Sequence, residues 1–234
     1  MGQLAQTLGR TIGGFVTLAN EFQRVAQVGR ASLYGTKQDA QMPINLIEDA
    51  RIPFLGFCGP RYQPGGVVLL AINPGGGGDS YVNRTQEDQA LIPLIESFLK
   101  ASSSQVESAF RRMCDEYSKM VQTWNLRRIL VPTIEACGLT IDQVCYLNCF
   151  PYRTAGDVRP SAQALAAAWS NITQPLINAL KPSRIVALGK KAGSVAEAKY
   201  FGHAKVYTVP RTIGDTRISA EALEILAKLS GGAA

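Results

Sequence analysis

Four short segments are mostly apolar, whereas the stretches between them alternate apolar and polar positions with a helical period. The apolar segments are residues 67–72, 144–147, 184–188 and 204–209. A continuous apolar run of this length is typical of a strand that is buried on both faces of a parallel sheet. The pattern therefore predicts four strands.

The intervening segments carry apolar residues at every third or fourth position. This spacing predicts helices over residues 89–99, 106–124, 126–137, 161–180, from about 191 onward, and 220–229. Ser161 and Ser219 are the predicted N-caps of two of them. Strands that alternate with helices predict an α/β protein with a three-layer α/β/α fold and a doubly wound, mainly parallel, four-stranded sheet.

The N-terminal part of the chain lacks this regular alternation. Residues 1–30 have apolar side chains at mixed helical spacings, which favours a structural helix over a targeting segment. Residues 34–64 are rich in Pro, Gly and Gln and predict irregular wrapping. No internal repeat or linker divides the chain, so we expect one domain over residues 1–234, with 1–65 as an N-terminal helical and irregular segment.

Composition narrows the class of protein further. The 234 residues are 46% hydrophobic and 18% charged, which excludes wholesale disorder. No apolar run approaches the roughly 18 residues of a membrane span, so we expect a soluble chain that does not bind membranes. The net charge of +6 permits a polyanionic partner without requiring one.

Cysteine and histidine usage argues against metal chemistry. The five cysteines contain no Cys-x-x-Cys pair, which disfavours a disulfide framework and a four-thiolate metal site. Buried, reduced thiols fit a cytoplasmic protein. His203 is the single histidine, so a His-rich zinc site is excluded. We expect no metal and no cofactor.

The ends of the predicted strands locate a candidate site. In doubly wound folds, ligands bind beyond the carboxyl ends of the strands. Here the strands end at Asn73-Pro74-Gly75, Asn148, Gly189 and Pro210-Arg211. Together they predict a polar pocket, neutral to basic, without an acid–base pair suited to peptide or ester hydrolysis.

Two of these elements have more than one interpretation. The glycine run 75–78 is either a flexible turn or a phosphate-binding loop with exposed backbone N–H groups. It does not match Gly-x-Gly-x-x-Gly, because residue 79 is aspartate, and it is not a P-loop. Asn148 is either a loop residue that hydrogen-bonds backbone or a ligand-recognising side chain.

The order of the segments resembles that of a known family. Residues 68–75 (Val-Leu-Leu-Ala-Ile-Asn-Pro-Gly) resemble the first motif of the uracil-DNA glycosylase superfamily, most closely its mismatch-specific and single-strand-selective branches. Residues 145–151 resemble the second-strand segment, whose asparagine recognises uracil, and residues 184–192 resemble the third-strand segment. The resemblance extends from about Gly66 to Leu226.

The resemblance implies roles for the strand-end residues. Asn73 would hold the attacking water through its amide oxygen, and Asn148 would pair with N3–H and O4 of uracil and exclude cytosine. The backbone of Pro74, Gly75 and Gly76 would lie under the base, where glycine permits close approach. An aromatic ring should stack on the flipped base, and the candidates are Tyr81 first, then Phe54, Phe57 and Phe150.

The last motif departs from the family. It usually begins His-Pro-Ser or Asn-Pro-Ser, whereas this chain has Val209-Pro210-Arg211-Thr212. The histidine that donates to uracil O2 is absent, so Arg211 or N–H groups of the glycine run would replace it, or the protein is slow or inactive. The following loop lies where the superfamily inserts a wedge into DNA, for which Ile213 is the apolar residue available. The candidate phosphate contacts are Arg211, Arg217, Arg153, Lys190, Arg159 and Lys191.

These observations predict a monomeric, cofactor-free DNA glycosylase that removes uracil from DNA and starts base excision repair, with free uracil as product. The cysteines lack the ligand cluster of the iron–sulfur branches, so no cluster is expected. Two alternatives remain: a nucleoside or nucleotide hydrolase of related fold, and a non-catalytic DNA-binding protein that has lost glycosylase activity. The missing histidine favours the second alternative.

Overall fold

A computed structural model describes residues 16–34, 52–75, 86–211 and 218–231. Within these ranges, five strands form one sheet in the order β1-β3-β2-β4-β5. They are β1 (Gly56–Cys58), β2 (Val67–Ala71), β3 (Val144–Asn148), β4 (Arg184–Leu188) and β5 (Lys205–Val209). Strands β2 to β5 pair in parallel, and β1 pairs antiparallel with β3. The predicted α/β class and mainly parallel sheet are therefore confirmed.

The prediction of four strands is wrong, because β1 forms within the segment expected to wrap irregularly. Its three residues are too few to give a readable pattern, and pairing with β3 defines them as a strand.

Gly56 makes this pairing possible. Its φ is +121°, and a Cβ there would overlap the carbonyl oxygen of Tyr146. Only glycine allows the two backbones to approach so closely.

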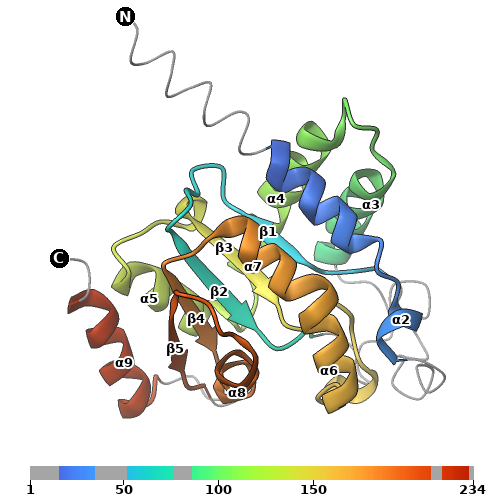
Figure 1. The fold of residues 1–234 in the computed structure, drawn as a ribbon. Coiled ribbons are helices and arrows are strands. Elements are labelled where there is room, and N and C mark those ends of the chain that lie inside the picture. Colours follow the sequence, from blue (N-terminus) through green and yellow to red (C-terminus); the bar gives the residue numbers. More distant parts are fainter. Residues whose placement is uncertain (1–15, 35–51, 76–85, 212–217, 232–234) are drawn as a thin grey trace, which may run out of the picture.

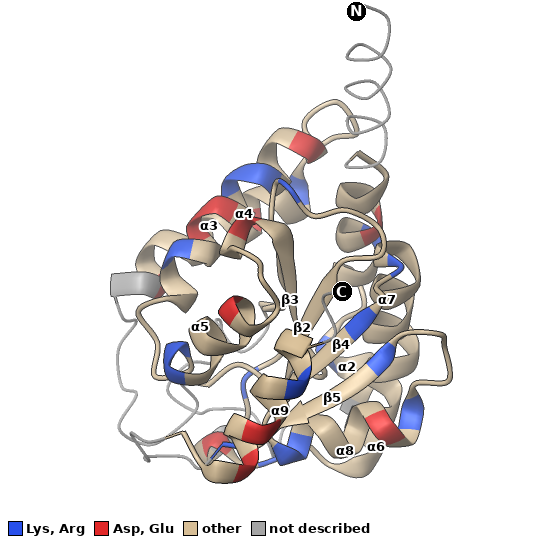
Figure 2. Ribbon diagram, turned by 90° about the vertical axis from the view of Figure 1, so that its left-hand side faces the viewer, with Lys and Arg blue, Asp and Glu red and all other residues tan. Residues whose placement is uncertain are grey.

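Helices cover both faces of the sheet, as the two perpendicular views show (Figure 1, Figure 2). One face is covered by α3 (Gln86–Lys100), α4 (Val106–Val121), α5 (Arg127–Ala136) and α9 (Ala220–Gly231). The other is covered by α6 (Ala162–Ala168), α7 (Gln174–Leu180) and α8 (Lys190–Lys199). The expected three-layer arrangement is compatible with this distribution.

The chain order places a topological switch point at β2. After β2 the chain passes to the α3–α5 face, whereas after β3 and β4 it passes to the α6–α8 face (Figure 1). In open α/β sheets, ligands generally bind beyond the carboxyl ends of the strands at such a point. All five residues of β2 are buried, as a central strand covered on both faces requires.

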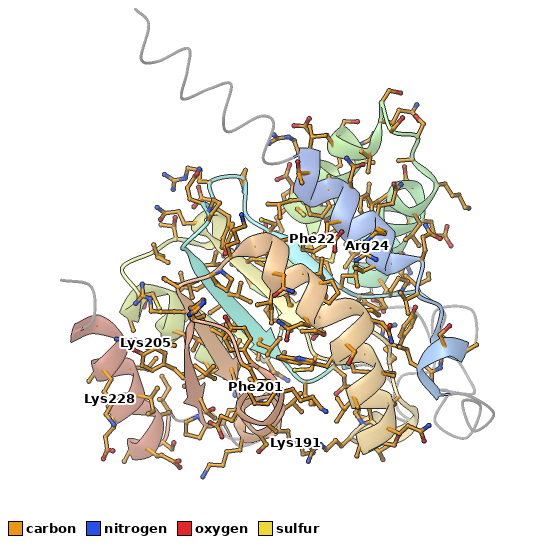
Figure 3. The ribbon with its side chains drawn as sticks, in the orientation of Figure 1. Phe22, Arg24, Lys191, Phe201, Lys205 and Lys228 are labelled. Carbon is orange, nitrogen blue, oxygen red and sulfur yellow. The ribbon has the colours of Figure 1, made fainter. Side chains whose placement is uncertain are left out.

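Two smaller helical elements lie near the N-terminus. A helix over residues 16–26 packs on the α3–α4 pair, where the rings of Phe22 and Phe110 lie 4.8 Å apart (Figure 3). It is followed by α2 (Arg30–Tyr34). The remainder of the predicted N-terminal helix, residues 1–15, lies outside the described residues.

The helix predicted over residues 161–180 contains a π-helical turn. Ser161 caps α6, because its hydroxyl accepts a hydrogen bond from the Ala164 N–H at 3.1 Å. Residues Trp169–Thr173 then widen into a π turn before α7 begins. Pro175 in the first turn of α7 has no N–H to complete the regular ladder, which accounts for the widening. Ser219 likewise caps α9, as predicted.

Among the described residues, no helix combines the length and apolarity needed to cross a membrane.

Candidate functional site at the carboxyl edge of the sheet

The loops that follow β2 and β3 run side by side. Ala71 pairs with Asn148 in the parallel register, and the ladder continues beyond it. The N–H of Cys149 donates to the Ala71 carbonyl at 2.8 Å, and that of Phe150 donates to Ile72 at 2.9 Å. This pairing brings Asn73 and Asn148 to the same edge of the sheet at the switch point.

The side-chain amide of Asn73 has a defined orientation. Its NH2 group lies 3.3 Å from the Pro74 carbonyl and 3.3 Å from the Thr154 hydroxyl oxygen. The carbonyl can only accept, and Thr154 already donates to the Val158 carbonyl at 2.6 Å, so both require a donor from Asn73. The amide oxygen Oδ1 makes no hydrogen bond within the described part of the chain. It is therefore available to accept one from a water molecule.

Asn148 is 2% exposed, and its amide is oriented by two neighbours. Its NH2 donates to the Phe54 carbonyl at 2.8 Å, and its Oδ1 accepts from the Tyr146 hydroxyl at 3.4 Å. Burial raises the pKa of Tyr146, so its hydroxyl stays protonated and able to donate. A flipped amide would bring Oδ1 against the Phe54 carbonyl oxygen, which is repulsive.

Arg211 follows β5 at the same edge and is exposed. Its aliphatic Cγ lies 3.4 Å from the position that a Cβ would occupy on Gly189, which has a φ of +113°. Its positive charge acts on Tyr146 in the direction opposite to burial, lowering the phenol pKa. The charge of Arg211 is therefore felt by a residue that contacts Asn148.

Arg153 does not lie on the surface, in contrast to its predicted role as a phosphate contact. Its side chain is 6% exposed and forms an ion pair with Asp88, 2.6 Å from Nη2 to Oδ1. Its Nε donates to the Gly75 carbonyl at 2.9 Å. A buried guanidinium that is already hydrogen-bonded within the protein cannot contact a DNA phosphate, so the predicted phosphate contact at Arg153 is wrong.

Among the described residues, no neighbouring atom would exclude a side chain at position 75. Gly75 is exposed, and a Cβ there would meet nothing within 4 Å. Pro74 beside it is buried.

The predicted aromatic partners that can be located are core residues. Phe150 is fully buried, with its ring centroid 5.9 Å from that of Tyr152. Phe57 is buried, with its ring centroid 5.9 Å from that of Tyr117 and 6.0 Å from that of Tyr146. Phe54 is buried beneath Arg153. Gly76 and the first candidate, Tyr81, lie outside the described residues.

The predicted DNA-contacting residues are only partly placed. Lys190 begins α8 and pairs with Glu221 at 2.9 Å, both side chains being more than half exposed. Lys191 lies on the outer surface of α8 (Figure 3). Ile213 and Arg217 lie outside the described residues.

Sequence reasoning missed three residues of the site. Thr154 and Asp88 gave no local signal, because their partners lie 81 and 65 positions away in the chain. Tyr146 could have been found, because residues two apart on a strand share a face and Tyr146 precedes Asn148 by two. Thr154 and Tyr146 hydrogen-bond the two asparagine side chains directly, whereas Asp88 acts through Arg153, which donates to the Gly75 carbonyl.

Metal ligation has little support in the described ranges, where no group of three or more His, Cys, Asp or Glu side chains could hold an ion. All five cysteines are buried free thiols. Burial raises the pKa of Cys149 and Cys145, which keeps both protonated and poorly nucleophilic.

No protein-family model matches this chain, and no curated protein matches it in sequence.

Proposed function

We propose that this protein is a DNA glycosylase that hydrolyses the N-glycosidic bond of uracil in DNA, the first step of base excision repair. The observation that carries the proposal is the pair of oriented amides, Asn73 and Asn148, on adjacent strand ends at the switch point. Each is turned so that its remaining hydrogen-bonding capacity suits one part of the reaction.

Asn73 supports the attack of water on the sugar. Because Pro74 and Thr154 hold its NH2 group, Oδ1 accepts a hydrogen from water and directs an oxygen lone pair towards C1′. A neutral amide is a weak base, so the water gives up its proton late, after the glycosidic bond has largely broken. As that bond breaks, positive charge develops on the sugar and negative charge on the departing base, and the proton released by the water balances the uracil anion, which ends as neutral free uracil.

Asn148 supports recognition of uracil over cytosine. After donating to Phe54, its NH2 retains one hydrogen for uracil O4, and its Oδ1 retains a lone pair for uracil N3–H. Cytosine presents an amino group at position 4 and an unprotonated N3, which is the opposite pattern. Its amino group would face the NH2 of Asn148 and leave buried polar groups unpaired, which discriminates strongly.

Arg211 supplies positive charge in place of the absent histidine. A guanidinium offers five donors in a planar fork and stays charged at all relevant pH values. Exposed at the end of β5 and acting electrostatically on Tyr146, it is suited to stabilise negative charge on the leaving uracil. The proposal therefore assigns Arg211 the role of anion partner.

The proposal is tested with a labelled oligonucleotide that contains one uracil. Incubation with the purified protein, followed by alkaline cleavage of abasic sites, should yield a shortened strand and free uracil. Asn73→Ala should lower this excision by about 100-fold or more, with little change in DNA binding. Asn178→Ala, at an exposed asparagine of α7, is the matched control and should behave as wild type.

Other outcomes contradict the proposal in distinguishable ways. Binding of the oligonucleotide without release of uracil would identify a non-catalytic DNA-binding protein. Hydrolysis of free nucleosides or nucleotides, with none in DNA, would identify the alternative hydrolase. An Asn73→Ala variant with full activity would remove Asn73 from the mechanism.

A further inference from the structure

A buried ion pair lies directly beside the two asparagine loops. The side chains of Arg153 and Asp88 are 6% and 7% exposed, and the Arg153 Nη2 is 2.6 Å from the Asp88 Oδ1. Asp88 belongs to the first turn of α3, whereas Arg153 follows β3. Burying two charges is costly even when they are paired, and apolar replacements of such pairs are often no less stable. Stability alone is thus a weak explanation for this pair.

Arg153 contacts both loops of the candidate site. On one side, its Nε donates to the Gly75 carbonyl at 2.9 Å, two residues after Asn73. On the other, its guanidinium carbon lies 4.6 Å from the ring centroid of Phe54. The carbonyl of Phe54 is the group that accepts from the Asn148 NH2. One planar side chain therefore supports the turn of Asn73 and the orienting partner of Asn148.

The backbone at Arg153 is also held in place. The Arg30 Nη1 donates to the Arg153 carbonyl at 2.7 Å. The next residue, Thr154, accepts from the NH2 of Asn73. A shift of residues 153–154 would therefore disturb Asn73 in two ways. It would move the Thr154 hydroxyl that accepts from the Asn73 side chain, and it would move the Arg153 side chain that holds the Gly75 carbonyl.

We infer that Arg153, anchored by Asp88, is a positioning residue that sets the relative placement of Asn73 and Asn148. Asp88 holds the guanidinium plane, and the plane in turn holds the Gly75 carbonyl and the Phe54 ring. Arginine is required because a lysine ammonium, although charged, lacks the planar fork that serves Asp88 and Gly75 at once. The inference rests on the proposed function, and it assigns Arg153 an internal role in place of a DNA contact.

The test compares Arg153→Lys with wild type. The lysine keeps a positive charge for Asp88 and gives up the contact with the Gly75 carbonyl. We expect kcat for uracil release to fall about 10- to 100-fold, because misplacement by about 1 Å can cost 100-fold. KM should change less than about threefold, since DNA contacts are untouched. Arg111→Lys is the matched control, because Arg111 pairs with Glu107 at 2.6 Å within α4, and its replacement by lysine should leave kcat for uracil release unchanged.

Hydrogen–deuterium exchange provides a readout that does not depend on activity. Peptides covering residues 52–55 and 70–75 should exchange faster in Arg153→Lys than in wild type, with the melting temperature nearly unchanged. If wild type releases no uracil, the proposed function fails, and faster exchange alone still upholds the positioning role. Unchanged exchange and unchanged kcat in a folded Arg153→Lys would overturn the inference.

A second variant covers the case in which Arg153→Lys does not fold. The double substitution Asp88→Asn with Arg153→Gln removes both charges, so neither remains buried without a partner. We expect it to fold and to show the same loss of kcat and the same faster exchange. A double variant with wild-type kcat and exchange would also overturn the inference.

Discussion

Replacement of Asn148 by aspartate tests whether this side chain recognises the base. The substitution keeps the shape and replaces the NH2 group by an oxygen that faces the Phe54 carbonyl, where the nitrogen now lies at 2.8 Å. Two acceptors cannot remain so close unless one carries a proton, and position 148 is only 2% exposed. Burial and the facing carbonyl should therefore raise the pKa of the new carboxyl, and buried carboxyls shift by as much as about 3 to 5 units.

The raised pKa predicts a pH-dependent loss of stability. The folded variant keeps a proton that the unfolded chain releases above about pH 3.9. Its stability is then greatest at low pH and falls by about 1.4 kcal/mol per pH unit until the folded pKa is reached. A shift of about 3 units makes the variant about 3 kcal/mol less stable at pH 7 than at pH 4. Urea unfolding of variant and wild type between pH 4 and 8 measures this difference.

Base release should follow the same titration. Below the folded pKa, the protonated carboxyl donates to Phe54 and has no hydrogen left for uracil O4, so uracil release falls. Above it, the carboxylate accepts from the cytosine amino group, so slow cytosine release should appear as pH rises. Asn171→Asp is the matched control, because the exposed Asn171 also donates to a backbone carbonyl at 2.8 Å. A flat stability profile, or a wild-type ratio of uracil to cytosine release in the folded variant, would refute the reasoning.

Two further predictions concern the water-holding amide and the DNA contact. Thr154→Val should slow uracil release about two- to tenfold, because Asn73 loses one orienting hydrogen bond worth about 0.5–1.5 kcal/mol. Thr154→Ser keeps the hydroxyl and should keep the wild-type single-turnover rate. Equal rates in the two variants would show that Thr154 has a purely structural role. Lys191→Ala should shallow the slope of log K against log salt by about 0.9 on duplex DNA if Lys191 neutralises one phosphate. Lys228→Ala is the control, because the C-terminal part of α9 lies against the start of β4, at the amino edge of the sheet. Equal slopes in the Lys191→Ala and Lys228→Ala variants would place Lys191 outside the DNA interface.

The sequence by itself determined the strands of the parallel sheet and the edge at which the two asparagines meet. Strands β2, β3 and β4 are buried along almost their whole length, so each appears as a local apolar run that needs no knowledge of its partners. Strand β5 lies at the edge of the sheet and is only partly buried, although apolar residues still predominate in it. Asn73 and Asn148 then fall at one edge because parallel strands share the direction of their carboxyl ends. The N-caps Ser161 and Ser219 were equally predictable, since a cap bonds to a neighbour three residues away.

Only the tertiary structure decided β1, the burial of Arg153 and the orientation of the two amides. Strand β1 exists through its pairing with β3, some 90 positions away in the chain, and leaves no periodic pattern of its own. An arginine after a strand ordinarily lies in solvent, and Arg153 is buried because Asp88 and the Gly75 carbonyl meet its donors. The amide of Asn148 likewise takes its direction from Phe54 and Tyr146. Apolar periodicity is a local property of the chain, whereas hydrogen-bond partners are chosen among groups that only folding brings together.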